Sequence, residues 1–377
     1  MHKKQRTAKL RAGFRAGFRA GALAVFCLAL TLVLSPMERD ALPVSGAAVI
    51  SPAADEPTAE QASLPKLGDA LIPLGSTTGI KLFSPGAMVV GFSPLECAGC
   101  CPAREGGLKT GDVLLALNGQ TIRSNEDLTR QMQALAQEQA VFTVLRESAR
   151  QEITVNAVYD PALQCYRIGA WVRDSVAGIG TVTFVDPETG VFGALGHGIC
   201  DSDTGQLIPF GCGSVMRSSV DRVQKGASGT PGQLCGSFDL VRDQGWLGGN
   251  TESGIFGRFT RQEAYQDLQP VPTAARSEIH TGPAVIRSNV SGTETREYAV
   301  EILRVYPKDS GVGRDLMLQV TDPQLLSATG GIVQGMSGSP ILQDGKLVGA
   351  VTHVLVNDPT RGYGISLEEM LENAPAA

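Results

Sequence analysis

The sequence predicts a mainly β chain, in which a small α+β domain precedes a larger all-β domain. Within residues 66–158, strand-like runs alternate with two short helical stretches. From Tyr166 onward, short strand-like segments are separated by glycine-containing turns, and helical patterns are scarce. Roughly 200 residues of short strands indicate a pair of barrels or a sandwich. At 377 residues, the chain is long enough for both domains to bury a core.

The N-terminal residues are predicted to form an export segment. The first 20 residues contain seven Lys or Arg and no acidic residue, although the whole chain has a net charge of −6. The rest of the chain is therefore acidic, which argues against nucleic-acid binding. An apolar run from Gly21 to Leu34 follows, shorter than the ~20 residues of a full membrane span. Residues 1–35 are predicted to be a membrane anchor or, alternatively, a cleaved signal peptide.

Residues 36–65 are rich in Ala, Pro, Ser and acidic residues and predict a flexible linker. The domain at 66–158 then shows a helix, a glycine turn, a strand and an Asn-Gly turn over residues 102–119. Ser124 is placed to cap a second helix, which would bury Leu128 and its neighbours one turn on. The pattern P-A-x-x-x-G-L-x-x-G-D-x-L-L-x-x-N-G resembles a PDZ domain.

That resemblance implies a groove in which an extended peptide terminus adds as a strand to a sheet edge. We expect the strand Ala87–Phe92 to form its lip. The candidate peptide-binding residues are Met88, Val89, Val90 and Gly91. A PDZ-like spacer without a ligand is the alternative.

A candidate nucleophile lies near the C-terminus. Ser337 stands between small residues in Gly335–Pro340, and the Asp344-Gly345 pair that follows predicts a β-hairpin. Such a serine has an exposed hydroxyl. The N–H groups of Gly335 and Ser337 are candidates for an oxyanion hole.

His197 is framed by glycines after a predicted strand, which makes it the candidate general base. Spacing alone does not separate the acids that could orient it, namely Asp201, Asp203, Asp315 and Asp322. His353 follows the hairpin and is a candidate for the substrate pocket, with a packed strand histidine as the alternative. The Cys97-x-x-Cys100-Cys101 run has no second pair at zinc spacing, so we expect neither metal nor cofactor.

Three stretches carry a more specific resemblance. Residues 190–201, 321–341 and 349–360 resemble the stage IV sporulation protein B family of serine peptidases. The resemblance implies that residues 159–377 form a chymotrypsin-like double barrel. It also implies a triad of His197, Asp322 and Ser337, and so selects Asp322 among the acids.

The same resemblance implies a biological role. Members are exported from the forespore into the space between the two membranes. There they cleave themselves and a membrane-bound regulator of an intramembrane protease, which leads to activation of the late mother-cell sigma factor. The PDZ-like domain would guide self-cleavage and target binding. A catalytically inactive PDZ-containing binding protein and a general envelope quality-control protease are the alternatives.

Overall fold

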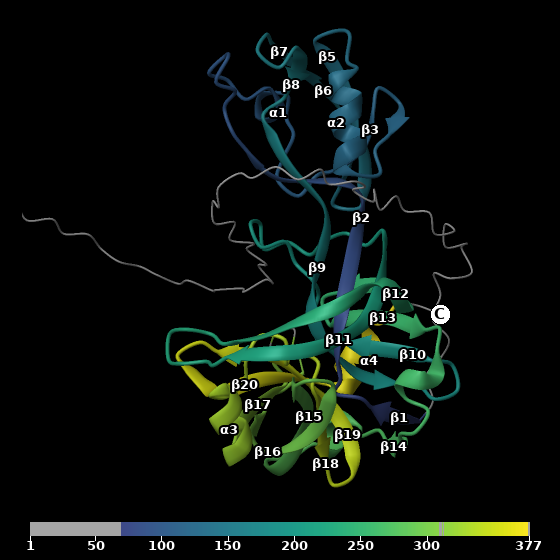
Figure 1. Cartoon of the computed structure of the whole chain (residues 1–377), viewed down its shortest axis with the longest axis vertical. Helices are drawn as coiled ribbons and strands as arrows, with labels where there is room; N and C mark the ends of the chain where they lie inside the picture. The colour runs from purple at the N-terminus through teal and green to yellow at the C-terminus, as the bar shows by residue number, and fades with distance from the viewer. Residues whose placement is uncertain (1–68, 309–310, 312, 376–377) are drawn as a thin grey trace, which may run out of the picture.

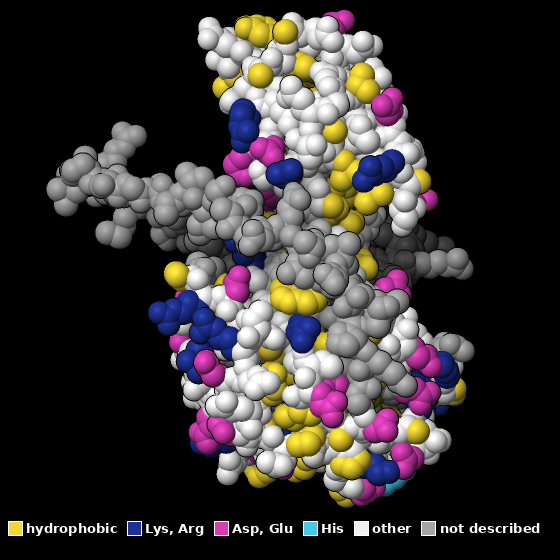
Figure 2. Space-filling view, turned by 90° about the vertical axis from the view of Figure 1, so that its right-hand side faces the viewer, with side chains coloured by type: hydrophobic (Ala, Val, Ile, Leu, Met, Phe, Trp, Pro, Cys, Tyr) yellow, Lys and Arg dark blue, Asp and Glu magenta, His cyan; other side chains and the backbone are white. Residues whose placement is uncertain are grey.

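The computed structural model describes residues 69–308, 311 and 313–375. The predicted export segment (1–35) and linker (36–65) lie outside the described residues. Within the described ranges, no helix is both long enough and apolar enough to cross a membrane. On the face shown in Figure 2, acidic and basic side chains are interspersed, without a large field of one sign.

The first barrel is a ring of six antiparallel strands in which each strand pairs with the next. In ring order the strands are β2 (Thr77–Phe92), β9 (Ala170–Val185), β10 (Val191–Ala194), β13 (Gly254–Phe259), β12 (Gln233–Thr251) and β11 (Cys212–Gln224). The short strands β1 (Ala70–Pro73) and β14 (Val271–Pro272) extend the sheet beside β9. Phe192, Phe259 and Val215 are among the side chains that fill this barrel.

The second barrel is also closed. Its strands, in order, are β15 (Gly282–Ser291), β16 (Glu294–Val305), β17 (Leu316–Val320), β20 (Asp358–Ser366), β19 (Lys346–Leu355) and β18 (Pro340–Gln343). Helix α3 (Pro323–Thr329) follows β17 and helix α4 (Leu367–Glu372) follows β20; the 3₁₀ turns are η2 (Gln262–Ala264) and η3 (Arg276–Glu278). The predicted double barrel is confirmed.

The PDZ-like part stands above the barrels in Figure 1. It consists of α1 (Pro102–Glu105), β3 (Val113–Leu117), β4 (Gln120–Thr121), α2 (Asn125–Gln133), β5 (Gln139–Arg146), β6 (Ala149–Asn156), β7 (Val158–Asp160) and β8 (Cys165–Arg167). The predicted cap of α2 is present, because Ser124 Oγ accepts a hydrogen bond from Asp127 N at 3.2 Å. Leu128 and Met132 are buried on the inner face of the helix, in the separate core of this part.

Two long strands, β2 and β9, belong to both parts of the molecule (Figure 1). Near their PDZ-like ends Met88 pairs with Arg173, and in the barrel Lys81 pairs with Ala177. This corrects the predicted boundaries of 66–158 and 159–377. β1 and the first half of β2 pair within the first barrel, whereas the start of β9 completes the PDZ-like sheet. Local sequence patterns do not show a strand that changes partners along its length.

The first part of the predicted groove lip is also corrected. Met88 pairs with Val113 of β3 on one side and with Arg173 of β9 on the other. Val89 likewise pairs with Val172, while its N–H donates to Asp112 O at 2.8 Å. Met88 and Val89 therefore lie inside the sheet, without the free edge that strand addition requires. The peptide-binding role of Val90 and Gly91 stays a prediction.

Candidate active site

Ser337 lies on the turn that leads into the β18–β19 hairpin. The predicted hairpin turns at Asp344 and Gly345, whose φ angles of 51° and 77° fit a type I′ turn. Ser337 is only partly buried. Its hydroxyl donates a hydrogen bond to the carbonyl oxygen of Thr352 at 2.7 Å. The hydroxyl is thus held by a neutral acceptor and has to rotate before it can donate to a base.

Along this turn, backbone N–H groups that donate a hydrogen bond alternate with N–H groups that donate none. Met336 N donates to Val333 O at 3.1 Å, and Gly338 N donates to Val351 O at 2.7 Å. The N–H groups of Gly335 and Ser337, which alternate with these two along the chain, make no hydrogen bond to the described residues. Gly335 has a φ of 97°, a conformation open to glycine. The two N–H groups predicted for an oxyanion hole therefore both lack an acceptor within the described residues, as such donors must before substrate binds.

His197 follows β10 on a tight turn in which Leu195 and Gly196 both have a φ of 68°. Its Nδ1 lies 2.9 Å from the carbonyl oxygen of Gly198. A carbonyl oxygen only accepts, so this contact requires a proton on Nδ1 and leaves the lone pair on Nε2. Burial lowers the pKa of His197 below its usual 6.5. The side chain is therefore a neutral imidazole suited to act as a base.

The histidine turn and the serine turn meet where the two barrels pack together. Leu195 N donates to Thr181 O at 3.1 Å, and Thr181 N donates to Ser337 O at 3.2 Å. A Cβ on Gly338 would lie 2.5 Å from Leu195 N, so only glycine fits at this contact. Within the described part of the chain, no hydrogen bond joins Ser337 directly to His197.

Asp322 occupies the N-cap of α3. Its Oδ1 accepts hydrogen bonds from Gln324 N at 2.8 Å and Leu325 N at 3.0 Å. Its Oδ2 accepts from Ala299 N at 3.3 Å. No hydrogen bond or ion pair to His197 occurs among the described residues. In this structure the carboxylate acts as a helix cap, and the catalytic role implied by the resemblance stays a prediction.

The other acids also have partners of their own. Asp201 is fully buried, pairs with Arg173 and accepts hydrogen bonds from the Asp203 and Thr204 N–H groups at 3.0 Å. Asp203 meets the same guanidinium at 2.8 Å. Arg173 lies where β9 passes from the PDZ-like sheet into the barrel, so it ties the loop after His197 to that junction. Sequence patterns gave no signal for this contact.

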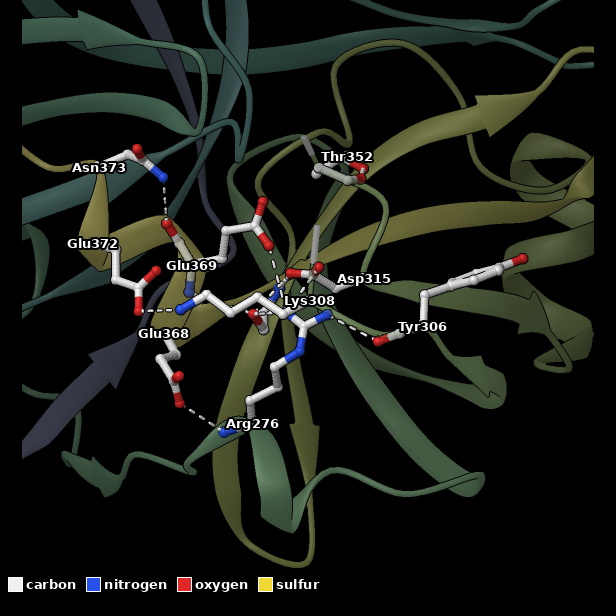
Figure 3. A network of polar contacts seen from close by, with 11 residues as sticks. Arg276, Tyr306, Lys308, Asp315, Thr352, Glu368, Glu369, Glu372 and Asn373 are labelled. Carbon is white, nitrogen blue, oxygen red and sulfur yellow. Dashed lines mark hydrogen bonds and ion pairs between the residues drawn. The ribbon is translucent and has the colours of Figure 1, made fainter. Parts of the chain in front are cut away.

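Asp315 belongs to a network that holds α4 against the second barrel (Figure 3). It accepts from Ser366 N at 2.7 Å and pairs with Arg276 at 2.8 Å. Burial acts to raise the pKa of Asp315, but hydrogen bonds from Glu369 and Ser366 lower it overall. Burial and the hydrogen bond shared with Asp315 raise the pKa of Glu369 to about 7. The network is structural, and none of its carboxylates hydrogen-bonds His197.

His353 lies beside the predicted base. Its ring centroid is 5.2 Å from that of His197, and its Nδ1 is buried without a hydrogen-bond partner in the described residues. Burial lowers the pKa of His353 to about 4, and the charge that His197 carries when protonated and the charge of Arg314 act in the same direction. The sequence indicated a residue near the site but did not reveal this ring contact.

The described residues hold no group of three or more His, Cys, Asp or Glu side chains that could bind a metal ion. A serine hydroxyl, a neutral imidazole and two open N–H groups supply the nucleophile, base and oxyanion donors of acyl transfer.

These features define a double-barrel serine endopeptidase that carries a PDZ domain, and comparison with known families agrees. A PDZ domain matches residues 98–157. The SpoIVB peptidase S55 family matches residues 164–371, more than half of the chain. The chain belongs to this family.

Individual relatives match shorter or more distant parts. Probable periplasmic serine endoproteases, described as DegP-like, from Brucella suis and Brucella melitensis are each 39% identical over 61 residues. Each match covers 16% of this chain and 12% of the relative, so the chain spans about an eighth of those proteins. The solved Rv3671c protease from M. tuberculosis, in its active form, is 15% identical, covers 52% of this chain and 73% of its own, and has a TM-score of 0.30.

Proposed function

We propose that this serine endopeptidase is an exported signalling protease of sporulation. It would cleave itself and a membrane-bound regulator of an intramembrane protease. Membership of the SpoIVB peptidase S55 family supports the proposal, as do the basic and apolar N-terminus and the PDZ domain ahead of the barrels. The observation that carries the assignment of catalysis is the serine turn itself, where the N–H groups of Gly335 and of Ser337 both lack a hydrogen-bond partner among the described residues.

The mechanism assigns Ser337 as nucleophile and His197 as base. Ser337 Oγ rotates away from Thr352 O and transfers its proton to His197 Nε2 as it attacks a peptide carbonyl. The oxyanion accepts hydrogen bonds from Gly335 N and Ser337 N. Throughout, Gly198 O accepts from His197 Nδ1–H, which fixes the ring orientation and stabilises its positive charge. His197 then protonates the leaving amine, and water releases the acyl-enzyme.

A fluorophosphonate probe tests the nucleophile directly. We expect the wild-type chain to be labelled at Ser337 and Ser337→Ala to remain unlabelled. Ser339→Ala is a matched control, because Ser339 is two residues away, fully buried, and bonded to Ser288 Oγ at 3.1 Å. Labelling that survives Ser337→Ala would assign the nucleophile elsewhere. An unlabelled wild type would favour the inactive binding protein.

The signalling role requires a separate experiment. The wild type and Ser337→Ala are incubated with the membrane-bound regulator of the intramembrane protease, and the products are identified by mass spectrometry. The proposal predicts discrete cuts in the regulator and within residues 36–65 of the chain itself, both absent with Ser337→Ala. Broad digestion of a peptide library would instead indicate a general quality-control protease.

A further inference from the structure

Thr181, in the middle of β9, contacts both catalytic turns. The residue is fully buried. Its Oγ1 donates a hydrogen bond to Gly335 O at 2.7 Å, and its N–H donates to Ser337 O at 3.2 Å. Its own carbonyl accepts from Leu195 N, two residues before His197. One residue therefore holds two carbonyls of the serine turn and the entrance to the histidine turn.

These contacts bear on the orientation of the oxyanion donors. The N–H of Ser337 belongs to the peptide plane between Met336 and Ser337. The planes on either side of it contain the Gly335 and Ser337 carbonyls, and Thr181 binds both of these. Rotation of the central plane, which would turn the Ser337 N–H away from a substrate, requires its neighbours to move as well.

The glycines of the serine turn explain why its backbone needs the hydrogen bonds from Thr181. Gly335 and Gly338 have φ angles of 97° and 95°, and glycine can leave such conformations at little steric cost. The Thr181 hydroxyl supplies the one side-chain hydrogen bond to the backbone of residues 334–338 among the described residues. Because it is buried, water does not replace it readily if it is removed.

We propose that Thr181 is a positioning residue of the oxyanion hole, whose hydroxyl holds the Gly335 carbonyl so that the Gly335 and Ser337 N–H groups face the substrate. This inference deepens the proposed function and rests on Ser337 being the nucleophile. Thr181 does not touch the reacting atoms. Its effect therefore falls on stabilisation of the transition state rather than on substrate binding.

The test compares Thr181→Val with Thr181→Ser in the full chain. Valine keeps the shape and removes the hydroxyl, whereas serine keeps the donor. We expect Thr181→Val to lower kcat about 10- to 100-fold, below the loss for removing an oxyanion donor itself, with KM within about twofold. Labelling by the fluorophosphonate probe should slow by a similar factor. Thr181→Ser should stay within about threefold of the wild type in both measurements.

Thr183→Val is the matched control. Thr183 lies two residues further along β9, is also fully buried, and its Oγ1 has no hydrogen-bond partner in the described part of the chain. We expect its kcat and labelling rate to be unchanged. Melting temperatures of all variants separate loss of fold from loss of positioning. If Thr181→Val does not fold, Thr181→Cys, which keeps the size with a weaker donor, should show a kcat loss that Thr181→Ser lacks.

Three outcomes would overturn the proposal: an unchanged kcat in a folded Thr181→Val, an equal loss in the serine variant, or a change in KM alone. Failure of the proposed function looks different. In that case neither the wild type nor any variant at position 181 is labelled at Ser337.

Discussion

The imidazole rings of His197 and His353 lie 5.2 Å apart, centroid to centroid, and are inclined by 36°. Two imidazoles at this distance do not both take up a proton readily, because the first charge disfavours the second. His353, whose pKa is lowered to about 4, stays neutral wherever His197 is active as a base. We therefore expect the ring of His353 to pack against that of His197 and to limit its movement.

Replacing His353 tests this packing role. We expect His353→Phe, which keeps an aromatic ring, to retain kcat/KM within about threefold, and His353→Ala to lose about tenfold because the base is less constrained. Steady-state kinetics on one peptide measure both. A shifted cleavage-site preference in His353→Phe would instead place the side chain in the substrate pocket, as the sequence hypothesis held.

The pH dependence of catalysis follows from the buried base. Since burial lowers the pKa of His197 below 6.5, the neutral form persists to lower pH than for an exposed histidine. We expect the acidic limb of kcat/KM to have its midpoint below pH 6.5. The contribution to stability has the same direction. The unfolded chain binds this proton more readily, so the free energy of unfolding decreases as pH falls from 6.5 through the lowered pKa. A midpoint above 6.5 would contradict the neutral-base assignment.

Asp322 offers a clear choice between two roles. As a helix cap, Asp322→Asn should keep the acceptor for Gln324 N and Leu325 N and leave kcat near that of the wild type. Asp322→Ala should then lower the free energy of unfolding by about 1 kcal/mol. If Asp322 is instead the triad acid, Asp322→Asn should lower kcat about 10⁴-fold while its free energy of unfolding stays that of the wild type. Kinetics and chemical denaturation on both variants decide between the two.

Glu369 should make stability depend on pH near neutrality. Its pKa is raised from 4.5 to about 7 by burial and by its hydrogen bond with Asp315. Between these values the folded protein holds a proton that the unfolded chain has lost, so this stabilisation decreases as pH rises toward 7. Glu369→Gln resembles the protonated form and should flatten the free energy of unfolding over that range.

The neighbouring Glu368 provides the control for that measurement. Its carboxylate accepts a hydrogen bond from Arg276 N at 3.0 Å and is exposed. Glu368→Gln should therefore leave the pH dependence of unfolding as in the wild type. Equal curves for Glu369→Gln and the wild type would show that Glu369 does not titrate in this range.

Arg173 should restrain the loop that follows His197. We expect Arg173→Gln to speed amide hydrogen exchange between Ile199 and Leu207 and to lower kcat by about three- to tenfold, because the loop loses its buried ion pair with Asp201. Arg167→Gln, which breaks a pair with Asp160 inside the PDZ-like part, should change neither. Unchanged exchange in Arg173→Gln would mean that the loop is held by its own turn.

Local chemistry explains what the sequence predicted correctly. The cap at Ser124, the turn at Asp344 and Gly345 and the glycine frames of His197 and Ser337 are each encoded within a few residues. The density of short strands indicates a pair of barrels or a sandwich, and the family resemblance selects the double barrel. The structure places these features as the sequence predicts.

The errors arose where distant segments meet. The sequence does not reveal that Val172 of β9 will cover the edge of Val89, because the two residues are far apart in the chain and neither carries a pairing signal. The choice of Asp322 as the orienting acid is different, because it rests on resemblance alone and stays a prediction. An Asp-Pro pair before a helix also indicates a capping role for Asp322. The same two residues are therefore compatible with a helix cap and with a triad acid.

The two strands shared between the PDZ-like part and the first barrel have a thermodynamic consequence. Neither part can unfold without stripping the hydrogen bonds from strands that the other part needs, so the two should melt in a single cooperative transition. A ligand that binds only the PDZ-like part then raises the unfolding free energy of the catalytic barrels by the same amount. Ligand occupancy of the PDZ-like part is then measurable as the thermodynamic stability of the catalytic barrels.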